Sequence, residues 1–260
     1  MLPDMNKTFS LNRFGRLFKK HTKEHYRNYL MSVAVLVGVM MLGGGFLVYM
    51  ADVQLDKSLQ TFFFFSIMLL AGTIFTSNVF ADLGERKKAI AWLVLPASHF
   101  EKYLVAWIYS FLLFIIVYTL IFYLALFTAL NIQHVYTHRT VILNIFENQI
   151  LQMFLVYAFL HAITFFGAVY FEKLHFIKTG FAFFIIIAVL ILLNKGLLSV
   201  FFGRPVDASP PFSNVRFAES GQMVDIKIER QNAPYILYLF IILTFIFWVA
   251  AYFRLKEKQV

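Results

Sequence analysis

The fold is decided around residues 82–104, which read DLGERKKAIAWLVLPASHFEKYL. This segment is a charged interruption between long apolar runs, and it carries its own helix signals. Pro96 disfavours helical geometry at the residue before it, so a helix that starts in the charged part must end there. Ser98 and Glu101 have the spacing of a capping box, which predicts the start of another helix. The segment therefore predicts a short, basic, partly apolar element outside a membrane, followed by a helix that re-enters it.

The composition of the 260-residue chain excludes an ordinary soluble domain. Hydrophobic residues make up 60% and charged residues 14% of the chain, whereas soluble domains contain about 45–50% and about 25%. The apolar residues form long blocks, which is typical of a polytopic membrane protein. The chain has no cysteine, so disulfides and thiolate metal sites are excluded. The net charge of +9 is explained by basic loops on one side of a membrane, and we expect no nucleic-acid binding.

Six apolar blocks are long enough to cross a bilayer, for which about 20 residues are needed. We expect these spans at about residues 30–50, 61–81, 103–130, 150–171, 176–193 and 235–253. The third block would be about 42 Å long as a helix. It must therefore tilt or project beyond a hydrocarbon core of about 30 Å.

An outer loop, residues 194–233, is expected between the fifth and sixth spans. Its apolar piece 197–202 is too short to cross a bilayer, so it is expected to re-enter, lie in the interface or pack on other helices. Residues 224–230, VDIKIER, alternate apolar and polar side chains like a short strand.

Lysine and arginine are unequally divided between the two sides of this predicted topology. Sixteen of the 23 lie in residues 1–29, in the connections after the second and fourth spans, and in the C-terminal tail. Seven lie in the remaining connections. Because basic residues collect in cytoplasmic loops, we predict that both termini are cytoplasmic.

Residues 1–29 are predicted to form a cytoplasmic amphipathic helix that lies in the membrane interface. Apolar or weakly polar side chains, including Phe14 and Phe18, recur at helical spacing from residue 11 to residue 29. Basic side chains recur on the opposite face, among them Arg16, Lys20 and Lys23. Such a helix places its cations towards anionic headgroups of the lipid bilayer. The alternative is that these cations are only the usual basic flank of a first span.

Motifs for nucleotide and metal binding are missing from the sequence. It contains neither G-x-x-x-x-G-K-[ST] nor G-x-G-x-x-G, so the chain cannot hold a nucleotide in either backbone cradle. Two H-x-x-x-H pairs occur, His21 with His25 and His134 with His138. Neither has the glutamate of H-E-x-x-H, and the topology places them on opposite sides of the membrane, so we expect no metal site.

His161 is the titratable residue deep in a predicted span. An ionisable group within a membrane is a candidate functional site by default. A neutral imidazole can also be a packing residue, satisfied by a helix carbonyl or by Thr164. Both interpretations stay open.

The run 87–98, KKAIAWLVLPAS, and the FEKYL that follows at 100–104 resemble the loop after the second span in type-2 ATP-binding-cassette (ABC) exporter permeases. The likeness is to the small six-span form in bacteria such as the Bacteroidetes, where a lysine-rich start leads to LPAS and an E-K pair. The layout of the spans resembles that family along nearly the whole chain, whereas the motif covers only this segment.

The resemblance implies a fold and a function. The fold would be an all-α polytopic membrane protein with six transmembrane helices, an N-terminal amphipathic interfacial helix and a cytoplasmic coupling helix within residues 83–95. The chain would be the permease subunit of an exporter in the bacterial inner membrane, and not itself an enzyme. Two permease chains, identical or related, would form the path. Two cytoplasmic ABC ATPase subunits would bind beneath them and hold ATP and Mg²⁺, so this chain would bind no cofactor.

The resemblance also implies which residues contact the ATPase. They are Glu85, Arg86, Lys87, Lys88, Ile90, Trp92, Leu93, Pro96, Ser98, Glu101 and Lys102. The turn at residues 172–178 would be a second contact.

Two other classes of function stay open. An intramembrane enzyme or hydrolase would use His161 with polar groups from other spans, although the sequence offers no nucleophile or metal set for it. A structural or sensory membrane protein would bind something outside through residues 203–233. The substrate is not predicted.

Overall fold

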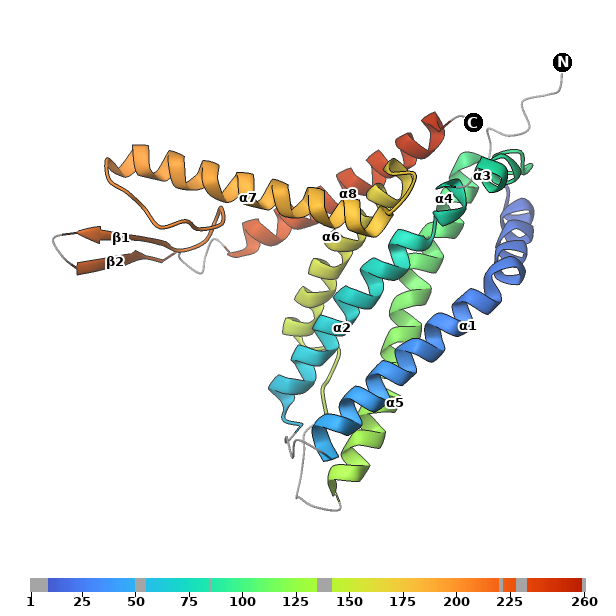
Figure 1. Cartoon of the computed structure of the whole chain (residues 1–260), viewed down its shortest axis with the longest axis horizontal. Coiled ribbons are helices and arrows are strands. Elements are labelled where there is room, and N and C mark those ends of the chain that lie inside the picture. The colour runs from blue at the N-terminus through green and yellow to red at the C-terminus, as the bar shows by residue number, and fades with distance from the viewer. Residues whose placement is uncertain are drawn as a thin grey trace.

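The computed structural model describes residues 9–49, 55–84, 86–134, 142–219, 222–227 and 233–258, and these are mostly helical (Figure 1). In chain order the helices are α1 Leu11–Tyr49, α2 Lys57–Asn78, the 3₁₀-helix η1 Ala81–Gly84, α3 Arg86–Leu93, α4 His99–Trp107, the π-helix η2 Ile108–Leu113, α5 Phe114–His134, α6 Asn148–Tyr170, α7 His175–Phe202 and α8 Ala233–Glu257. An antiparallel hairpin, β1 Val215–Glu219 and β2 Gln222–Ile226, lies between α7 and α8.

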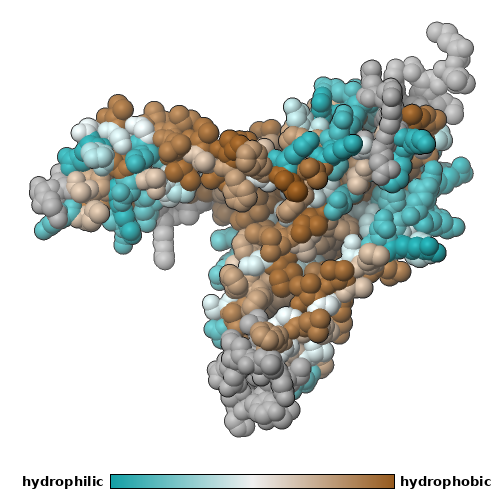
Figure 2. Space-filling model, in the orientation of Figure 1, coloured by the Kyte–Doolittle hydropathy of each residue, from teal (hydrophilic) through white to brown (hydrophobic). Residues whose placement is uncertain are grey.

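Six helical stretches are long and apolar enough to cross a membrane, as the sequence predicts. They are α1, α2, the continuous stretch α4–η2–α5, α6, α7 and α8. Figure 2 shows hydrophobic side chains over the middle of the molecule and hydrophilic ones gathered around the start of α1 and α3. Apart from the hairpin, the regular elements of the described residues are helices, which agrees with an all-α membrane protein of the multi-pass class.

The third span begins earlier than residue 103 because of its cap. The predicted capping box is confirmed: the Glu101 N–H donates to Ser98 Oγ at 3.1 Å, and the Ser98 N–H donates to Glu101 Oε2 at 2.9 Å. These bonds satisfy two N–H groups that a helix start otherwise leaves free. The helical stretch from His99 to Asn131 has 33 residues. It would be about 50 Å long, so it projects well beyond a hydrocarbon core of about 30 Å.

The predicted end of the fifth span at residue 193 is corrected by the structure. Helix α7 continues through Asn194, Lys195 and Gly196 and ends only at Gly203, whose φ of 64° is left-handed. Asn and Gly cost only about 1 kcal/mol or less inside a helix, less than breaking its hydrogen bonds in an apolar setting. The piece 197–202 is therefore the last part of one helix and not a separate re-entrant segment.

The predicted strand within residues 224–230 is confirmed for residues 224–226, which form the end of β2. Its partner β1 was not predicted. The hairpin lies beside the end of α7, where the Phe202 and Phe217 ring centroids are 5.3 Å apart. The Asn194 amide donates to the Ser209 carbonyl at 3.0 Å, so the outer loop folds back along α7.

Two buried clusters hold the helices together. The larger one lies among α1, α2, α5 and α6, and its fully buried side chains include Phe64, Met68, Tyr118 and Tyr157. The second lies where the residues that follow α2 meet α3, α4, α6 and α8, and it includes Phe80, Tyr103 and Phe165. This second cluster supports the end of the molecule that carries α3.

Helix α7 packs on the other helices through its first turns, and its far end contacts the outer loop and the hairpin. Its buried residues are His175 and Thr179. A Cβ atom at Gly167 of α6 would lie 2.0 Å from Thr179 Oγ1, so glycine is what allows the two helices to approach there. Figure 1 shows α7 extending from this contact to the hairpin, away from α1, α2 and α5.

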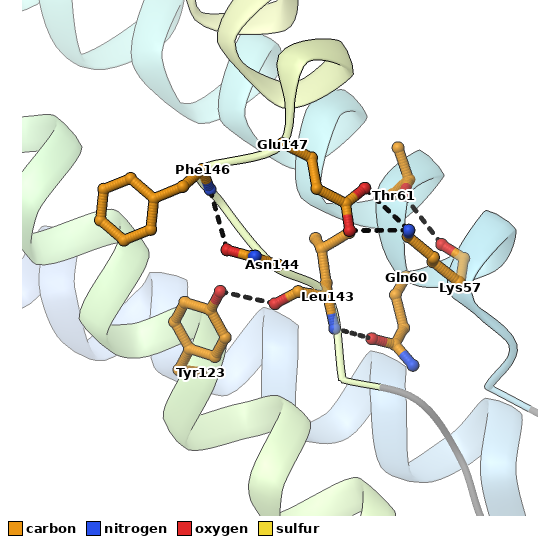
Figure 3. A network of polar contacts seen from close by, with 8 residues as sticks. All are labelled: Lys57, Gln60, Thr61, Tyr123, Leu143, Asn144, Phe146 and Glu147. Carbon is orange, nitrogen blue, oxygen red and sulfur yellow. Dashed lines mark hydrogen bonds and ion pairs between the residues drawn. The ribbon is translucent and has the colours of Figure 1, made fainter.

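A polar network ties the segment before α6 to α2 and α5, at the end of the bundle opposite α3 (Figure 3). The Leu143 N–H donates to Gln60 Oε1 at 2.9 Å, and the Tyr123 hydroxyl donates to the Leu143 carbonyl at 2.7 Å. Lys57 and Glu147 form an ion pair with 2.7 Å between Nζ and Oε2. These bonds satisfy backbone groups that would otherwise be buried without partners.

Candidate functional site

Helix α3 lies at one end of the molecule, with the start of α1, the α6–α7 turn and the end of α8 (Figure 1). It is one short helix between η1 and the bend before Ser98. The predicted short element within residues 83–95 is therefore present, and Pro96 follows its end as expected. The predicted contact residues that the structure describes are all on α3, the bend or the first turn of α4.

Trp92, together with the buried Ala89, packs α3 against the body of the protein. Its ring is half-buried and meets Phe80 edge-on, with 6.2 Å between the centroids. Lys102 Nζ lies 5.1 Å from the indole centroid, a cation–π contact. Trp92 therefore faces inward, towards α2 and α4.

The outward side of α3 is apolar and basic. Ile90 is 45% exposed and Val94, just after the helix, is 76% exposed. Lys87 and Lys88 are also exposed. This side of α3 therefore carries exposed aliphatic side chains next to two cations.

Some predicted contact residues have no described side chain. Arg86 and Leu93 are placed as the first and last residues of α3, but only their backbone is described. Glu85 lies outside the described residues.

Glu101 completes the capping box of α4 and also contacts the start of α1. Its side chain is fully buried, and Oε1 accepts a hydrogen bond from the Ser10 N–H at 2.8 Å. The same oxygen lies 3.3 Å from Arg13 Nη2. A buried carboxylate needs such partners, because an unpaired charge there is strongly unfavourable. Spacing in the sequence revealed the cap, but no local pattern could reveal Ser10 and Arg13.

Asp82, in η1, forms a second link to α1 and also contacts α3. Its carboxylate lies 3.2 Å from His25 Nε2 of α1 and 3.6 Å from Lys88 Nζ of α3. The pair with His25 is ionic only when the imidazole is protonated. Sequence reasoning did not single out Asp82.

The first part of α1 departs from the prediction of a separate interfacial helix. It is helical from Leu11, but it runs without a break into the first span. Its aromatic side packs on protein: the Phe18 ring lies 4.8 Å from the Tyr109 ring, and Phe14 lies 6.2 Å from Phe18. The basic side, with Arg16, Lys20 and Lys23, faces outward. Lys20 pairs with Glu24 at 3.6 Å.

The turn between α6 and α7, predicted as a second contact, touches the segment before α3. A Cβ atom at Gly84 would lie 2.1 Å from the Glu172 carbonyl oxygen. Lys258, after α8, donates to the Val169 carbonyl at 3.1 Å. Partial burial lowers the pKa of Lys258, while nearby Glu172 opposes that shift. The segment before α3 and the residue after α8 therefore both lie close to the end of α6 and the turn that follows it.

The space inside this junction is too small for a substrate. A cavity of about 20 Å³ lies among Trp92, Lys102 and His21. It can hold one water molecule, whereas ligand pockets usually measure about 300–1,000 Å³. This cavity is therefore not a ligand-binding pocket.

Both ring nitrogens of His161 on α6 have hydrogen-bond partners, one on α8 and one on the π-helix η2. The Trp248 indole N–H donates to His161 Nδ1 at 3.2 Å, so the ring proton is on Nε2. Nε2 lies 3.0 Å from Ser110 Oγ, which itself donates to the Ala106 carbonyl at 2.8 Å. Ser110 belongs to the π-helix, where the widened turn presents it to α6. This geometry links α6, α8 and the third span, and it leaves neither ring nitrogen free to act as a base.

Across the described ranges, no group of three or more His, Asp or Glu side chains could hold a metal ion. Of the two histidine pairs, His21 and His25 lie ring against ring, with 4.5 Å between their centroids. His138 lies outside the described residues, and only the backbone of His134 is placed.

Comparison of the chain with protein-family models, with curated proteins and with solved structures found no match.

Proposed function

We propose that this chain is the permease subunit of an ABC exporter, driven by a separate cytoplasmic ATPase that docks on α3. The observation that supports this most directly is the form of α3: a short helix held from inside by Trp92 and turned outward with Ile90 and Val94. An element that packs against the start of a membrane span and presents exposed apolar side chains is suited to receive force from a partner.

The surroundings of α3 support the same proposal. The α6–α7 turn lies beside it through Gly84 and Glu172, so a partner beneath α3 would meet both connections. Both follow spans whose other ends lie far away in the bilayer, so a displacement of this surface would reach several helices. ATP and Mg²⁺ would be bound by the partner, and this chain would need no cofactor.

A second permease chain completes the proposed transporter. Helices α7 and α8 keep long apolar faces exposed, for example Phe184 at 69% and Phe245 at 57%. In a membrane such faces are covered by lipid or by another transmembrane chain. The location would be the bacterial inner membrane, as the family resemblance implies. The distribution of basic residues favours an orientation with both chain termini in the cytoplasm.

The experiment is co-purification of an ATP-binding-cassette protein with the tagged chain from mild detergent. The double variant Ile90→Ser with Val94→Ser removes exposed apolar contacts from α3 without touching Trp92. We expect it to lose the ATPase while its amount in the membrane fraction stays normal. A matched control is Met223→Ser, which changes an equally exposed apolar residue on the distant hairpin.

Unchanged ATPase recovery with the double variant would contradict the docking of the partner on α3. Failure of the unmodified chain to recover any ATP-binding-cassette protein would contradict the proposed function as a whole.

A further inference from the structure

Two adjacent residues in the first turn of α4 hold two different elements. Glu101 holds the start of α1 through the Ser10 N–H and Arg13. Lys102 holds α3 through the face of the Trp92 ring. Glu101 is 0% and Lys102 4% exposed, so neither contact is a surface ion pair weakened by water.

A third residue, Asp82, contacts both α1 and α3. Asp82 lies before α3 and pairs with His25 of α1 and Lys88 of α3. The attachments to α1 are therefore made at its first turn and again about three turns later, so this part of α1 cannot pivot about a single point. Aromatic packing fills the space between, with Phe18 against Tyr109 at 4.8 Å.

We infer that Asp82, Glu101 and Lys102 join the first part of α1, α3 and the start of α4 into one rigid joint. Because α1 continues as the first span and α4 as the third, any displacement of α3 is passed to both spans together. Asp82, Glu101 and Lys102 are thus positioning residues, which act through the elements that they hold. This inference needs no particular partner and stands apart from the proposed function.

Glu101→Gln is the sharpest variant, because it separates the two roles of this side chain. A glutamine oxygen still accepts from the Ser98 N–H and keeps a capping box. Its amide nitrogen is a donor, so it cannot replace the oxygen that faces the Ser10 N–H and Arg13. Lys102→Met tests the other side, since it keeps the apolar stem and removes the cation above Trp92.

The absence of cysteine makes a direct distance measurement possible. Spin labels are placed at Lys19→Cys on α1 and Lys87→Cys on α3, both exposed positions that take no part in the three attachments. Double electron–electron resonance, measured in lipid vesicles, then gives the distribution of distances between the spin labels on α1 and α3. We expect a narrow distribution in the doubly labelled chain and loss of that narrow peak in Glu101→Gln and in Lys102→Met.

Two controls distinguish a joint from general destabilisation. Glu24→Gln removes an exposed carboxylate whose partner is Lys20 on the same helix, and it should keep the narrow peak. Ser98→Ala weakens the helix cap without removing Glu101, so it should lower the unfolding temperature and still keep the narrow peak. Narrow distributions in both Glu101→Gln and Lys102→Met would overturn the inference.

If Glu101→Gln does not fold, Arg13→Gln provides the same test from the partly exposed side of the pair. A broadened distribution in Arg13→Gln supports the joint, and an unchanged one overturns it.

Discussion

The carbonyl oxygen of Glu172 lies where a side chain at residue 84 would begin, since a Cβ atom built on Gly84 would be only 2.1 Å from it. The contact brings together two connections that are far apart in the sequence. It also means that the surface beneath α3 and the α6–α7 turn cannot be displaced independently without opening a backbone contact.

Gly84→Ala should therefore push the α6–α7 turn away and destabilise the protein. Overpacking at a site bounded by backbone costs about 1–3 kcal/mol, and the measurement is the free energy of unfolding in detergent. Gly180→Ala is the matched control, because nothing lies within 4 Å of a Cβ atom there. The control should be neutral or stabilising by up to about 1 kcal/mol. Equal effects of the two substitutions would show that Gly84 is not closely packed.

Removal of the cap at Ser98 should weaken the start of the third span. Ser98→Ala takes away the acceptor of the Glu101 N–H, and loss of such a cap costs about 1 kcal/mol. Ser98→Thr keeps an acceptor and should lie closer to the unmodified protein. Ser58→Ala, at an exposed serine of α2, is the control. Chemical denaturation would show no difference between Ser98→Ala and Ser58→Ala if the cap were unimportant.

The contact between His161 and Trp248 should appear as coupling between two substitutions. His161→Phe leaves the Trp248 indole N–H without its acceptor, at a cost of about 1–3 kcal/mol. Once Trp248→Phe has removed that donor, His161→Phe should cost less. A double-mutant cycle of unfolding free energies measures the difference. Strict additivity would mean that the hydrogen bond of 3.2 Å contributes nothing to stability.

Substitution of Gln60 should destabilise the end of the molecule that lies opposite α3. The side-chain oxygen of Gln60 accepts from the Leu143 N–H (Figure 3), and the side-chain nitrogen donates to the Leu55 carbonyl at 2.8 Å. Gln60→Leu keeps the volume but leaves both backbone groups without this partner, so we expect a loss of about 1–3 kcal/mol. Thr61→Val, at the neighbouring position, removes only a bond to its own helix and should cost less. Hydrogen exchange of the Leu143 amide gives a local check, because it should become faster only in the Gln60 variant.

Local signals in the sequence were sufficient for the spans and the cap. Long apolar blocks predicted six membrane helices, and Ser98 with Glu101 predicted where α4 begins, because both signals depend on neighbouring residues. The break expected at residues 194–196 did not occur, since the helix hydrogen bonds outweigh the poor helix propensity of Asn194 and Gly196.

The parts that could not be predicted depend on contacts between distant residues. The apolar and basic faces of residues 11–29 predicted an amphipathic helix. They could not show whether its aromatic face would contact lipid or protein, because both are apolar partners. Arg13 and Glu101 are 88 positions apart, and no short pattern relates them. The π-helix at Ile108–Leu113 likewise has no sequence signal, since Ser110 of this helix and its partner His161 lie far apart in the sequence.

Helix α7 has the geometry of a lever. It is 28 residues long, or about 42 Å, and it rests on the bundle only at its first turns, where Thr179 lies against Gly167. The hairpin is attached near the opposite tip, through Asn194 with Ser209 and through Phe202 with Phe217. A rotation of a few degrees at this fulcrum would carry the outer loop through a distance many times larger than the movement at Gly167.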